Sequence, residues 1–142
     1  MTILKYILQT EISESTKNLS LLIFRVTISI SLFNTHGLKK IIHFEDTLNN
    51  IPDPLGMGSE LSTFFAIFAN VFCPLLIVLG VLTRLAIIPI LSITLIGFFV
   101  VHAADPWSVR DVPLMYSIVF SLFLILGPGK YSIDQSIINR LK

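Results

Sequence analysis

The residues best suited to chemistry in this sequence are two histidines that close separate apolar stretches. His36 lies at the end of the stretch 19–37, and His102 lies at the end of the stretch 85–103. Imidazole transfers protons near neutral pH and binds metals. Three interpretations are therefore open: structural hydrogen bonding at helix ends, a proton or quinone site, and a metal or haem site. The candidate outer site comprises His36, Lys39, His102, Asp105, Asp111 and Tyr116, flanked by Asn34 and Arg110. Because HxxxH and CxxC motifs are both missing from the sequence, we assign no metal to it.

A second candidate site lies deeper, at Arg25 in the first apolar stretch and Asn70 in the second. An arginine inside a membrane costs roughly 2.5–3.5 kcal/mol on insertion scales, so it normally faces a partner. The helical rise puts the two residues at similar depth, and Pro74 leaves the Asn70 carbonyl without its usual helical donor. We therefore predict a midplane contact between Arg25 and Asn70. It would serve as a structural clamp or as a polar site for a quinone head group, unless Arg25 extends to the membrane surface instead.

A third group is predicted to be structural. Arg84 follows a tight turn, Asp134 falls in the first turn of a tail helix, and Tyr131 lies close by in the sequence. We expect an ion pair between Arg84 and Asp134 that holds the tail against the turn. The single cysteine, Cys73, lies in an apolar run and is expected to act as a small hydrophobic residue. One cysteine makes neither an internal disulfide nor a redox pair.

The composition shows what kind of element must position these residues. The chain has 142 residues, of which 54% are hydrophobic and 13% are charged, whereas an average soluble domain has about 25% charged residues. A soluble globule of this size could not bury so many apolar side chains. A soluble enzyme, a nucleic-acid-binding protein and a disordered segment are therefore excluded. A net charge of +1 indicates no polyanionic partner.

Four apolar stretches approach the roughly 20 residues that a helix needs to cross a bilayer. They cover about 19–37, 61–82, 85–103 and 108–126. We predict an all-α, four-transmembrane-helix bundle over residues 19–129, preceded by a segment 1–18. Short interfacial helices are expected after the first and fourth spans, at 38–49 and 130–142, because apolar residues recur there at helical spacing.

The distribution of basic residues predicts the orientation in the membrane. Four spans place both termini on one side, and Lys and Arg are enriched on the cytoplasmic side of membrane proteins. The side with the termini carries six such residues against three on the other: Lys5, Lys17, Arg84, Lys130, Arg140 and Lys142 against Lys39, Lys40 and Arg110. We therefore expect cytoplasmic termini.

Five motifs along the chain resemble those of the DoxX family of small bacterial membrane proteins. They are HGLKK (36–40), IPDPLG (51–56), LGVLTR (79–84), HAADPW (102–107) and LGPGKYSID (126–134). The resemblance implies a four-helix fold in the bacterial cytoplasmic membrane. The positions that match the family pattern are Arg25, His36, Gly37, Lys39, Pro54, Arg84, His102, Asp105, Tyr116, Gly127, Pro128, Gly129 and Asp134. Asn70 departs from it, since relatives often carry a glutamate there that would pair with the arginine.

The resemblance also implies a function. Some DoxX proteins are subunits of a thiosulfate:quinone oxidoreductase, and others partner superoxide dismutase and a sulfurtransferase. The leading expectation is an accessory or quinone-linked subunit of a membrane redox system, with quinone as cofactor and redox proteins as partners. The alternative is a non-enzymatic scaffold or chaperone for partner proteins. A transporter ranks third, because four spans are too few for an inverted-repeat transporter unless the protein forms a homo-oligomer. Whether the chain is itself an enzyme stays open.

Overall fold

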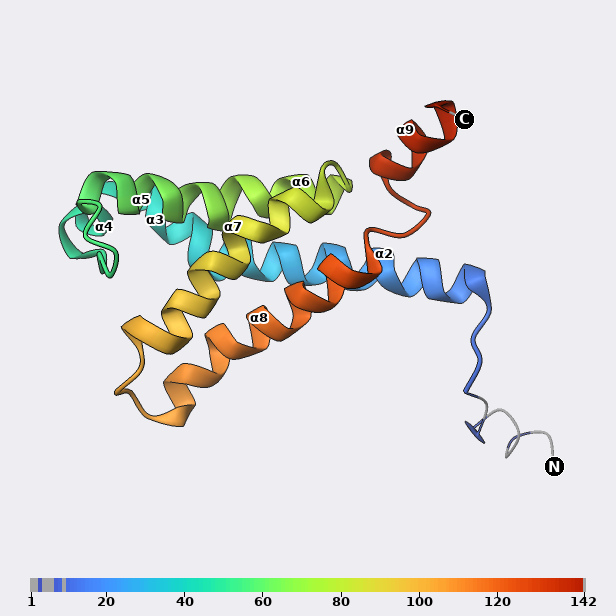
Figure 1. Cartoon of the computed structure of the whole chain (residues 1–142), viewed down its shortest axis with the longest axis horizontal. Coiled ribbons are helices and arrows are strands. Elements are labelled where there is room, and N and C mark those ends of the chain that lie inside the picture. Colours follow the sequence, from blue (N-terminus) through green and yellow to red (C-terminus); the bar gives the residue numbers. More distant parts are fainter. Residues whose placement is uncertain (1–2, 4–6, 9, 142) are drawn as a thin grey trace.

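The computed structural model describes residues 3, 7–8 and 10–141. It contains four helices long and apolar enough to cross a membrane, namely Glu14–Ile42, Ser59–Leu79, Thr83–Val101 and Trp107–Leu126. Within the described residues, helix is the only regular secondary structure. The predicted all-α fold with four spans is therefore confirmed (Figure 1).

Three of the four spanning helices contain a π-helical segment of five residues, labelled η1 to η3; the first two lie within their helices and the third ends its helix. In chain order the elements are α2 (Glu14–Leu32), η1 (Phe33–Gly37), α3 (Leu38–Ile42), α4 (Phe44–Asn50), α5 (Ser59–Ile67), η2 (Phe68–Phe72), α6 (Cys73–Leu79), α7 (Thr83–Ile96), η3 (Gly97–Val101), α8 (Trp107–Leu126) and α9 (Ile133–Leu141).

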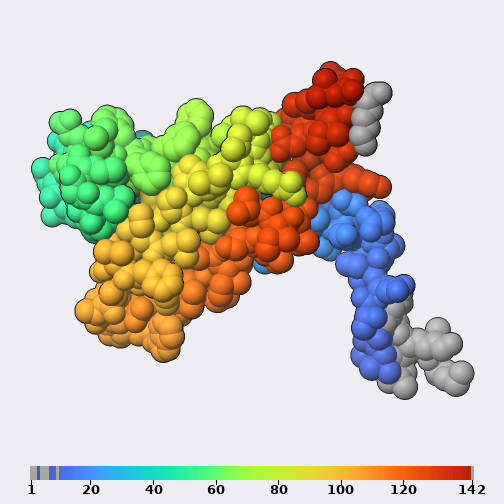
Figure 2. All heavy atoms as spheres, viewed as in Figure 1, coloured from blue at the N-terminus to red at the C-terminus, as the bar shows by residue number. Residues whose placement is uncertain are grey.

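The two ends of the bundle carry different features. One end, which we call the terminal face, holds the start of α2, the turn between α6 and α7, the end of α8 and the tail helix α9 (Figure 1). The connections 43–58 and 102–106 lie at the other end, the loop face. In Figure 2, α9 projects from the terminal face beyond the four-helix body. Lys5 and Lys142, which enter the charge count for orientation, lie outside the described residues.

The first spanning helix is longer than its apolar stretch. It begins after Ser13, whose hydroxyl accepts the Thr16 amide at 3.1 Å as an N-cap. It then continues past Gly37 to Ile42, so the first part of the expected interfacial helix extends the span. The backbone breaks at His43 (φ −112°, ψ 53°), and the separate helix α4 follows. Residues 38–42 therefore belong to the same continuous helix as His36.

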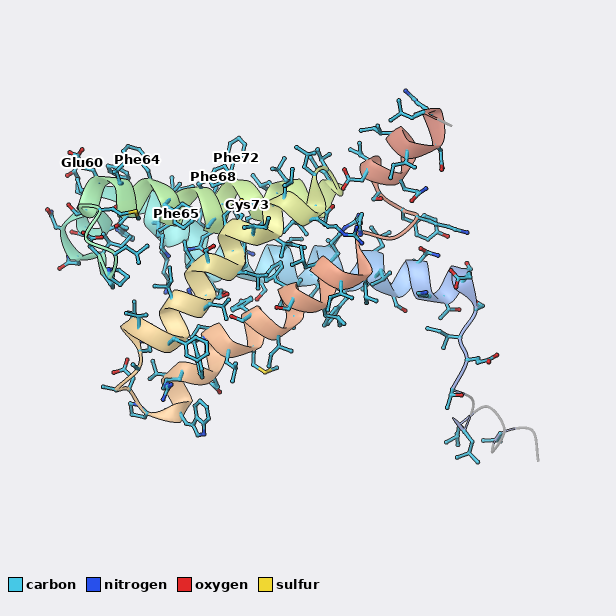
Figure 3. All side chains as sticks on the ribbon, viewed as in Figure 1. Glu60, Phe64, Phe65, Phe68, Phe72 and Cys73 are labelled. Atoms are coloured by element: carbon cyan, nitrogen blue, oxygen red, sulfur yellow. The ribbon has the colours of Figure 1, made fainter. Side chains whose placement is uncertain are left out.

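The core lies where the four spans meet. Its buried side chains are Leu32, Cys73, Ile77, Ala86, Ile87, Ile90, Phe120 and Phe123. Most other large apolar side chains point outward, as Figure 3 shows for Phe64, Phe68 and Phe72. Lipid tails are as apolar as these side chains, so exposure of this kind carries little cost in a membrane. Cys73 is buried in the core, which fits its expected role as a small hydrophobic residue.

Gly37 sets the alignment of the first two spans. A Cβ atom at this position would collide with the backbone carbonyl oxygen of Asn70, so the absence of a side chain allows the two backbones to approach closely. The spans run in opposite directions, and residues before Gly37 therefore lie beside residues after Asn70. Arg25 precedes Gly37 by twelve residues, or about 18 Å of helix. This distance carries Arg25 to the end of α6.

Candidate functional site

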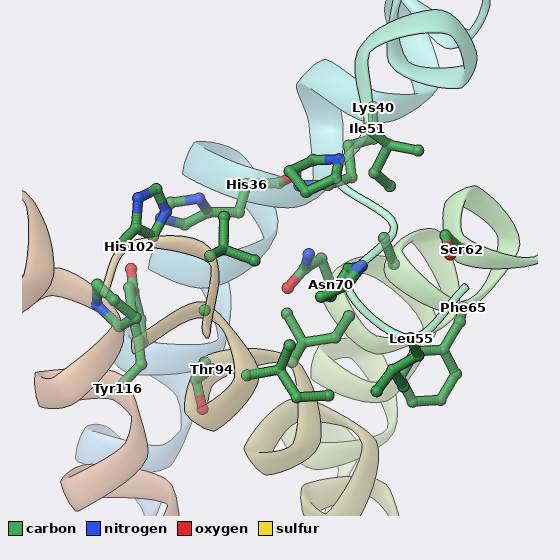
Figure 4. Close-up of a pocket in the computed structure, with 18 of the residues that line it drawn as sticks. His36, Lys40, Ile51, Leu55, Ser62, Phe65, Asn70, Thr94, His102 and Tyr116 are labelled. Carbon is green, nitrogen blue, oxygen red and sulfur yellow. The ribbon is translucent and has the colours of Figure 1, made fainter. Parts of the chain in front are cut away.

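A cavity of about 270 Å³ opens between the loop-face halves of the spanning helices (Figure 4). All four spans and the connection 51–57 contribute to its wall. Most of the wall is apolar, with aliphatic side chains and Phe65. The polar side chains that line it are His36, Lys40, Ser62, Asn70, Thr94, His102 and Tyr116. The cavity therefore combines an apolar wall with a small set of polar groups, as binding sites for small molecules do.

The three π-helical segments all contribute residues to the wall of this cavity. Each is closed by a backbone hydrogen bond spanning five residues: Leu38 to Phe33, Cys73 to Phe68, and His102 to Gly97. The first contributes His36 to the wall and the second contributes Asn70. A π turn adds one residue to a helical turn and so rotates the following face, and such turns occur frequently at functional sites.

Pro74 gives a local reason for the second π-helical segment. Proline lacks the N–H that would donate to the carbonyl of Asn70 four residues earlier. The helix instead closes through the Cys73 amide to the Phe68 carbonyl. The freed Asn70 carbonyl faces Gly37. The sequence feature used to predict a polar site at Asn70 therefore does shape the backbone there.

One end of the cavity is formed by aromatic and imidazole rings. The rings of His36 and Tyr116 meet edge to face, with centroids 5.7 Å apart and planes at 87°. The Tyr116 hydroxyl pairs with Ser31 Oγ at 3.1 Å. His36 Nε2 is buried and, among the described residues, has no hydrogen-bond partner. A buried polar atom without a partner is uncommon and calls for an explanation, of which a bound ligand is one.

His102 connects this end of the cavity with the loop face. Its Nδ1 atom lies 2.7 Å from Asp105 Oδ2, and the two side chains are 36% and 45% exposed. His102 lines the cavity, whereas Asp105 lies behind it in the connection 102–106. Figure 4 shows the His102 ring at the same end of the cavity as the His36 ring. The structure thus brings His36, His102 and Tyr116 together.

The other residues of the predicted outer site lie outside the cavity wall. Lys40 lines the cavity in place of Lys39, because it follows His36 by one helical turn, and its Nζ donates to the His36 carbonyl at 2.7 Å. The guanidinium of Arg110 lies over the rings of Phe98 and Trp107, 4.7 and 5.2 Å from their centroids. Lys39, Asn34 and Asp111 are exposed. The i, i+4 spacing from His36 was the signal that could have identified Lys40.

The predicted contact between Arg25 and Asn70 is wrong. Arg25 is only 1% exposed, and its guanidinium donates to the carbonyls of Pro128 (2.6 Å), Tyr131 (2.9 Å) and Val78 (3.4 Å). The alignment at Gly37 explains the error, since it separates Arg25 from Asn70 along the bundle. Arg25 therefore fastens the α8–α9 connection to the terminal face, while Asn70 belongs to the cavity.

The predicted ion pair between Arg84 and Asp134 is also wrong. The Asp134 carboxylate accepts the amides of Leu82 (2.8 Å) and Thr83 (3.0 Å), and Arg84 Nη2 donates to the Ile125 carbonyl at 3.2 Å. Leu82 has a left-handed conformation (φ 46°) just before α7, and the first amides of a helix lack internal partners. A carboxylate satisfies them and complements the helix dipole. The tail is held at the turn by this cap.

The part of the chain described by the structure holds no group of three or more His, Cys, Asp or Glu side chains placed to bind a metal ion. The side chains that gather at the cavity are instead two imidazoles, an ammonium, an amide and hydroxyls. These groups make hydrogen bonds and transfer protons. The site is therefore suited to a small, mainly apolar ligand that carries hydrogen-bonding groups.

Comparisons with known proteins place this fold among membrane proteins. The model of the family described as DoxX matches residues 20–103. A protein of Haemophilus influenzae, described as uncharacterized, is 26% identical over 83% of this chain and 83% of its own length. An uncharacterized membrane protein of Mycobacterium tuberculosis is 26% identical over 85% of this chain and 83% of its own. No solved structure matches the chain. The family match includes His36, Asn70 and His102.

Proposed function

The chain belongs to the DoxX family, and we propose that it is a quinone-linked subunit of a membrane redox system whose loop-face cavity binds the quinone head group. The observation that carries the proposal is the convergence of three π-helical segments on one cavity. Single π turns are rare in proteins overall, and those that do occur are often found at functional sites. Three of them around one cavity support a binding site there.

The size and lining of the cavity support a quinone head group. Its volume of about 270 Å³ lies just below the range usual for ligand pockets, about 300–1,000 Å³, and so suits a small head group. The wall is mainly apolar and suits a flat ring, while Lys40 and Asn70 offer N–H donors to ring oxygens. Among the described residues that line the cavity, none is a carboxylate, so an electron-rich oxygen meets no fixed negative charge.

Electrons for such a quinone would come from a partner protein. The chain has a single cysteine, and Cys73 is buried in the core away from water. A dithiol centre within one copy of this chain is therefore not available. We accordingly propose redox proteins as partners, in the bacterial cytoplasmic membrane, with both termini in the cytoplasm as the distribution of Lys and Arg favours.

Quinone binding by the purified protein tests the proposal. The protein is purified in mild detergent, its lipid extract is assayed for quinones, and a short-chain quinone is titrated while fluorescence of the single tryptophan is recorded. We expect saturable binding of one quinone per chain. Asn70→Leu should weaken binding roughly tenfold, as loss of one hydrogen bond does.

Asn34→Leu is the matched control, because Asn34 is an exposed residue of the same type outside the cavity wall. It should bind quinone as the unmodified protein does. An extract free of quinone, together with linear, unsaturable quenching, would contradict the proposal and favour a non-enzymatic scaffold. Equal losses in both variants would show that the cavity is not the binding site.

A further inference from the structure

The hydrogen bond between His102 and Asp105 fixes which ring nitrogen of His102 carries a hydrogen. An ionised carboxylate only accepts hydrogen bonds, so at 2.7 Å the Nδ1 atom of His102 must be the donor. In a neutral imidazole the other nitrogen, Nε2, then carries a lone pair. Asp105 thus leaves His102, which lines the cavity, with an acceptor nitrogen at Nε2.

Most other oxygens in the cavity wall are already occupied. Ser62 Oγ donates to Asp53 Oδ1 at 2.8 Å, and Thr94 Oγ1 accepts from Ser117 Oγ at 2.8 Å. The Tyr116 hydroxyl is paired with Ser31.

Three nitrogen-bearing side chains complete the set besides His102. Lys40 has only hydrogens to offer, and the Asn70 amide offers both a donor and an acceptor. His36 Nε2 has no partner among the described residues, so it donates or accepts according to the tautomer of its ring. These three side chains can therefore bind a ligand oxygen in either protonation state. His102 is the group whose role is fixed by its partner.

We infer that the cavity selects the reduced ligand, a quinol, because neutral His102 accepts the hydrogen bond from a ring hydroxyl through Nε2. This inference rests on the proposed function and adds to it the protonation state of the bound ligand. A quinone presents only acceptor oxygens, and its carbonyl would face the lone pair of Nε2. A quinol presents a hydroxyl hydrogen there. Asp105 is a positioning residue in this scheme, since it acts on the ligand through His102.

The substitution Asp105→Asn tests the role of Asp105 in holding the hydrogen of His102 on Nδ1. An asparagine amide can donate to Nδ1 as well as accept from it, so Nδ1 no longer has to carry the ring hydrogen and His102 can donate through Nε2. The variant keeps the size and hydrogen-bonding reach of the side chain at position 105. It should therefore remove or invert the preference of the cavity for quinol. Asp111→Asn is the matched control, because it makes the same chemical change at an exposed residue outside the cavity wall.

The test compares the affinity of both redox forms of one short-chain quinone under anaerobic conditions at about pH 8.5, where imidazole groups are predominantly neutral. The unmodified protein and Asp111→Asn should bind the quinol roughly tenfold more tightly than the quinone, the effect of one hydrogen bond. Asp105→Asn should lose or invert that ratio. Nitrogen-15 NMR of labelled histidine should show the Nδ1–H tautomer of His102 in the unmodified protein.

The outcomes separate this inference from the proposed function. If the unmodified protein binds neither form, the proposed function fails. If it binds both forms equally, or if the His102 tautomer changes in Asp105→Asn while the ratio stays the same, the selection by His102 is overturned while quinone binding stands. Should Asp105→Asn not fold, the NMR spectrum of the unmodified protein decides, and an Nε2–H tautomer would overturn the inference.

Discussion

Gly37 in the first span lies directly against the backbone carbonyl of Asn70 in the second, where a Cβ atom would have no room. Both residues belong to π-helical segments, η1 and η2. Their contact fixes how far the two helices are shifted along each other. It therefore determines which residues face the cavity and which reach the terminal face.

Gly37→Ala should destabilise the protein by about 1–3 kcal/mol, the usual cost of an overpacked contact. The added methyl group meets backbone rather than a flexible side-chain end, so the helices must separate. Thermal unfolding in detergent measures the loss. Gly97→Ala is the control, because its Cβ would lie 3.7 Å from the nearest atom, Pro113 Cβ, which is ordinary contact. Equal effects of the two substitutions would contradict the assigned alignment.

Removal of the Arg25 guanidinium should loosen the connection between α8 and α9. Arg25→Met leaves the carbonyls of Pro128 and Tyr131 without their donor, and an unsatisfied buried polar group costs about 1–3 kcal/mol. Amide hydrogen exchange in residues 127–132 should therefore become faster. Arg25→Lys should restore part of the protection, because one ammonium lacks the planar fork that binds several carbonyls.

Asn70→Leu provides the contrast for the Arg25 experiment. Since Arg25 and Asn70 do not share a hydrogen bond, this variant should leave exchange in residues 127–132 unchanged. Faster exchange there in Asn70→Leu would revive the clamp that the sequence predicted.

The capping of α7 by the tail gives a third prediction. Asp134→Ala should destabilise the protein by about 0.5–2 kcal/mol, the usual cost of a lost N-cap, because the amides of Leu82 and Thr83 lose their acceptor. Asp134 and Arg84 bind different groups, so adding Arg84→Gln should give an effect additive to within about 0.3–0.5 kcal/mol. A larger coupling in this double-mutant cycle would show that an ion pair exists after all.

The connection over the cavity should respond to acid through Asp53. Its carboxylate accepts the Gly58 amide (2.7 Å), the Ser62 hydroxyl (2.8 Å) and the Met57 amide (3.0 Å). These hydrogen bonds, that from Gly58 above all, hold the pKa of Asp53 below its ordinary value of 3.8. Because the pKa is lower in the folded state, the ionised carboxylate stabilises the protein at pH values above the ordinary pKa. This contribution is lost as the pH falls through the folded-state pKa.

Amide exchange in residues 57–62 should therefore accelerate, relative to the intrinsic rate, as the pH falls below about 4. Asp53→Asn should show faster exchange that no longer changes with pH in this way. Asp46→Asn, in the preceding helix α4, changes an exposed carboxylate outside this turn and should keep the original acid response. An acid response that persists in Asp53→Asn would assign it to another group.

The sequence specified the spans well, because hydropathy and helix length together fix where a chain can cross a bilayer. It also singled out His36, His102 and Tyr116, since histidine and tyrosine at the ends of apolar stretches are conspicuous. The predicted contact of Arg25 was wrong because counting residues from the ends of the apolar stretches puts Arg25 and Asn70 at equal depth in the membrane. The first helix in fact runs from Glu14 to Ile42, and the contact at Gly37 shifts the alignment.

The π-helical segments and the partner of Asp134 could not be predicted from hydropathy. A π-helical segment depends on a small balance of backbone hydrogen bonds, and only the second one has a visible cause in Pro74. Asp134 lies beside the α6–α7 turn as predicted, yet it meets amides there because Leu82 takes a left-handed conformation. Opposite charges suggested a pair, whereas unpaired backbone groups determined the partner.

The most direct test of the account is photo-crosslinking of an azido-quinone in membranes that contain the full chain, followed by mapping of the modified residues. The account predicts labelling of the cavity wall around His36, Asn70 and Tyr116, and loss of this labelling when unmodified quinone competes. Labelling confined to the outward-facing Phe64, Phe68 and Phe72, and unaffected by competition, would contradict it, because that pattern is what a quinone dissolved in the surrounding lipid would give.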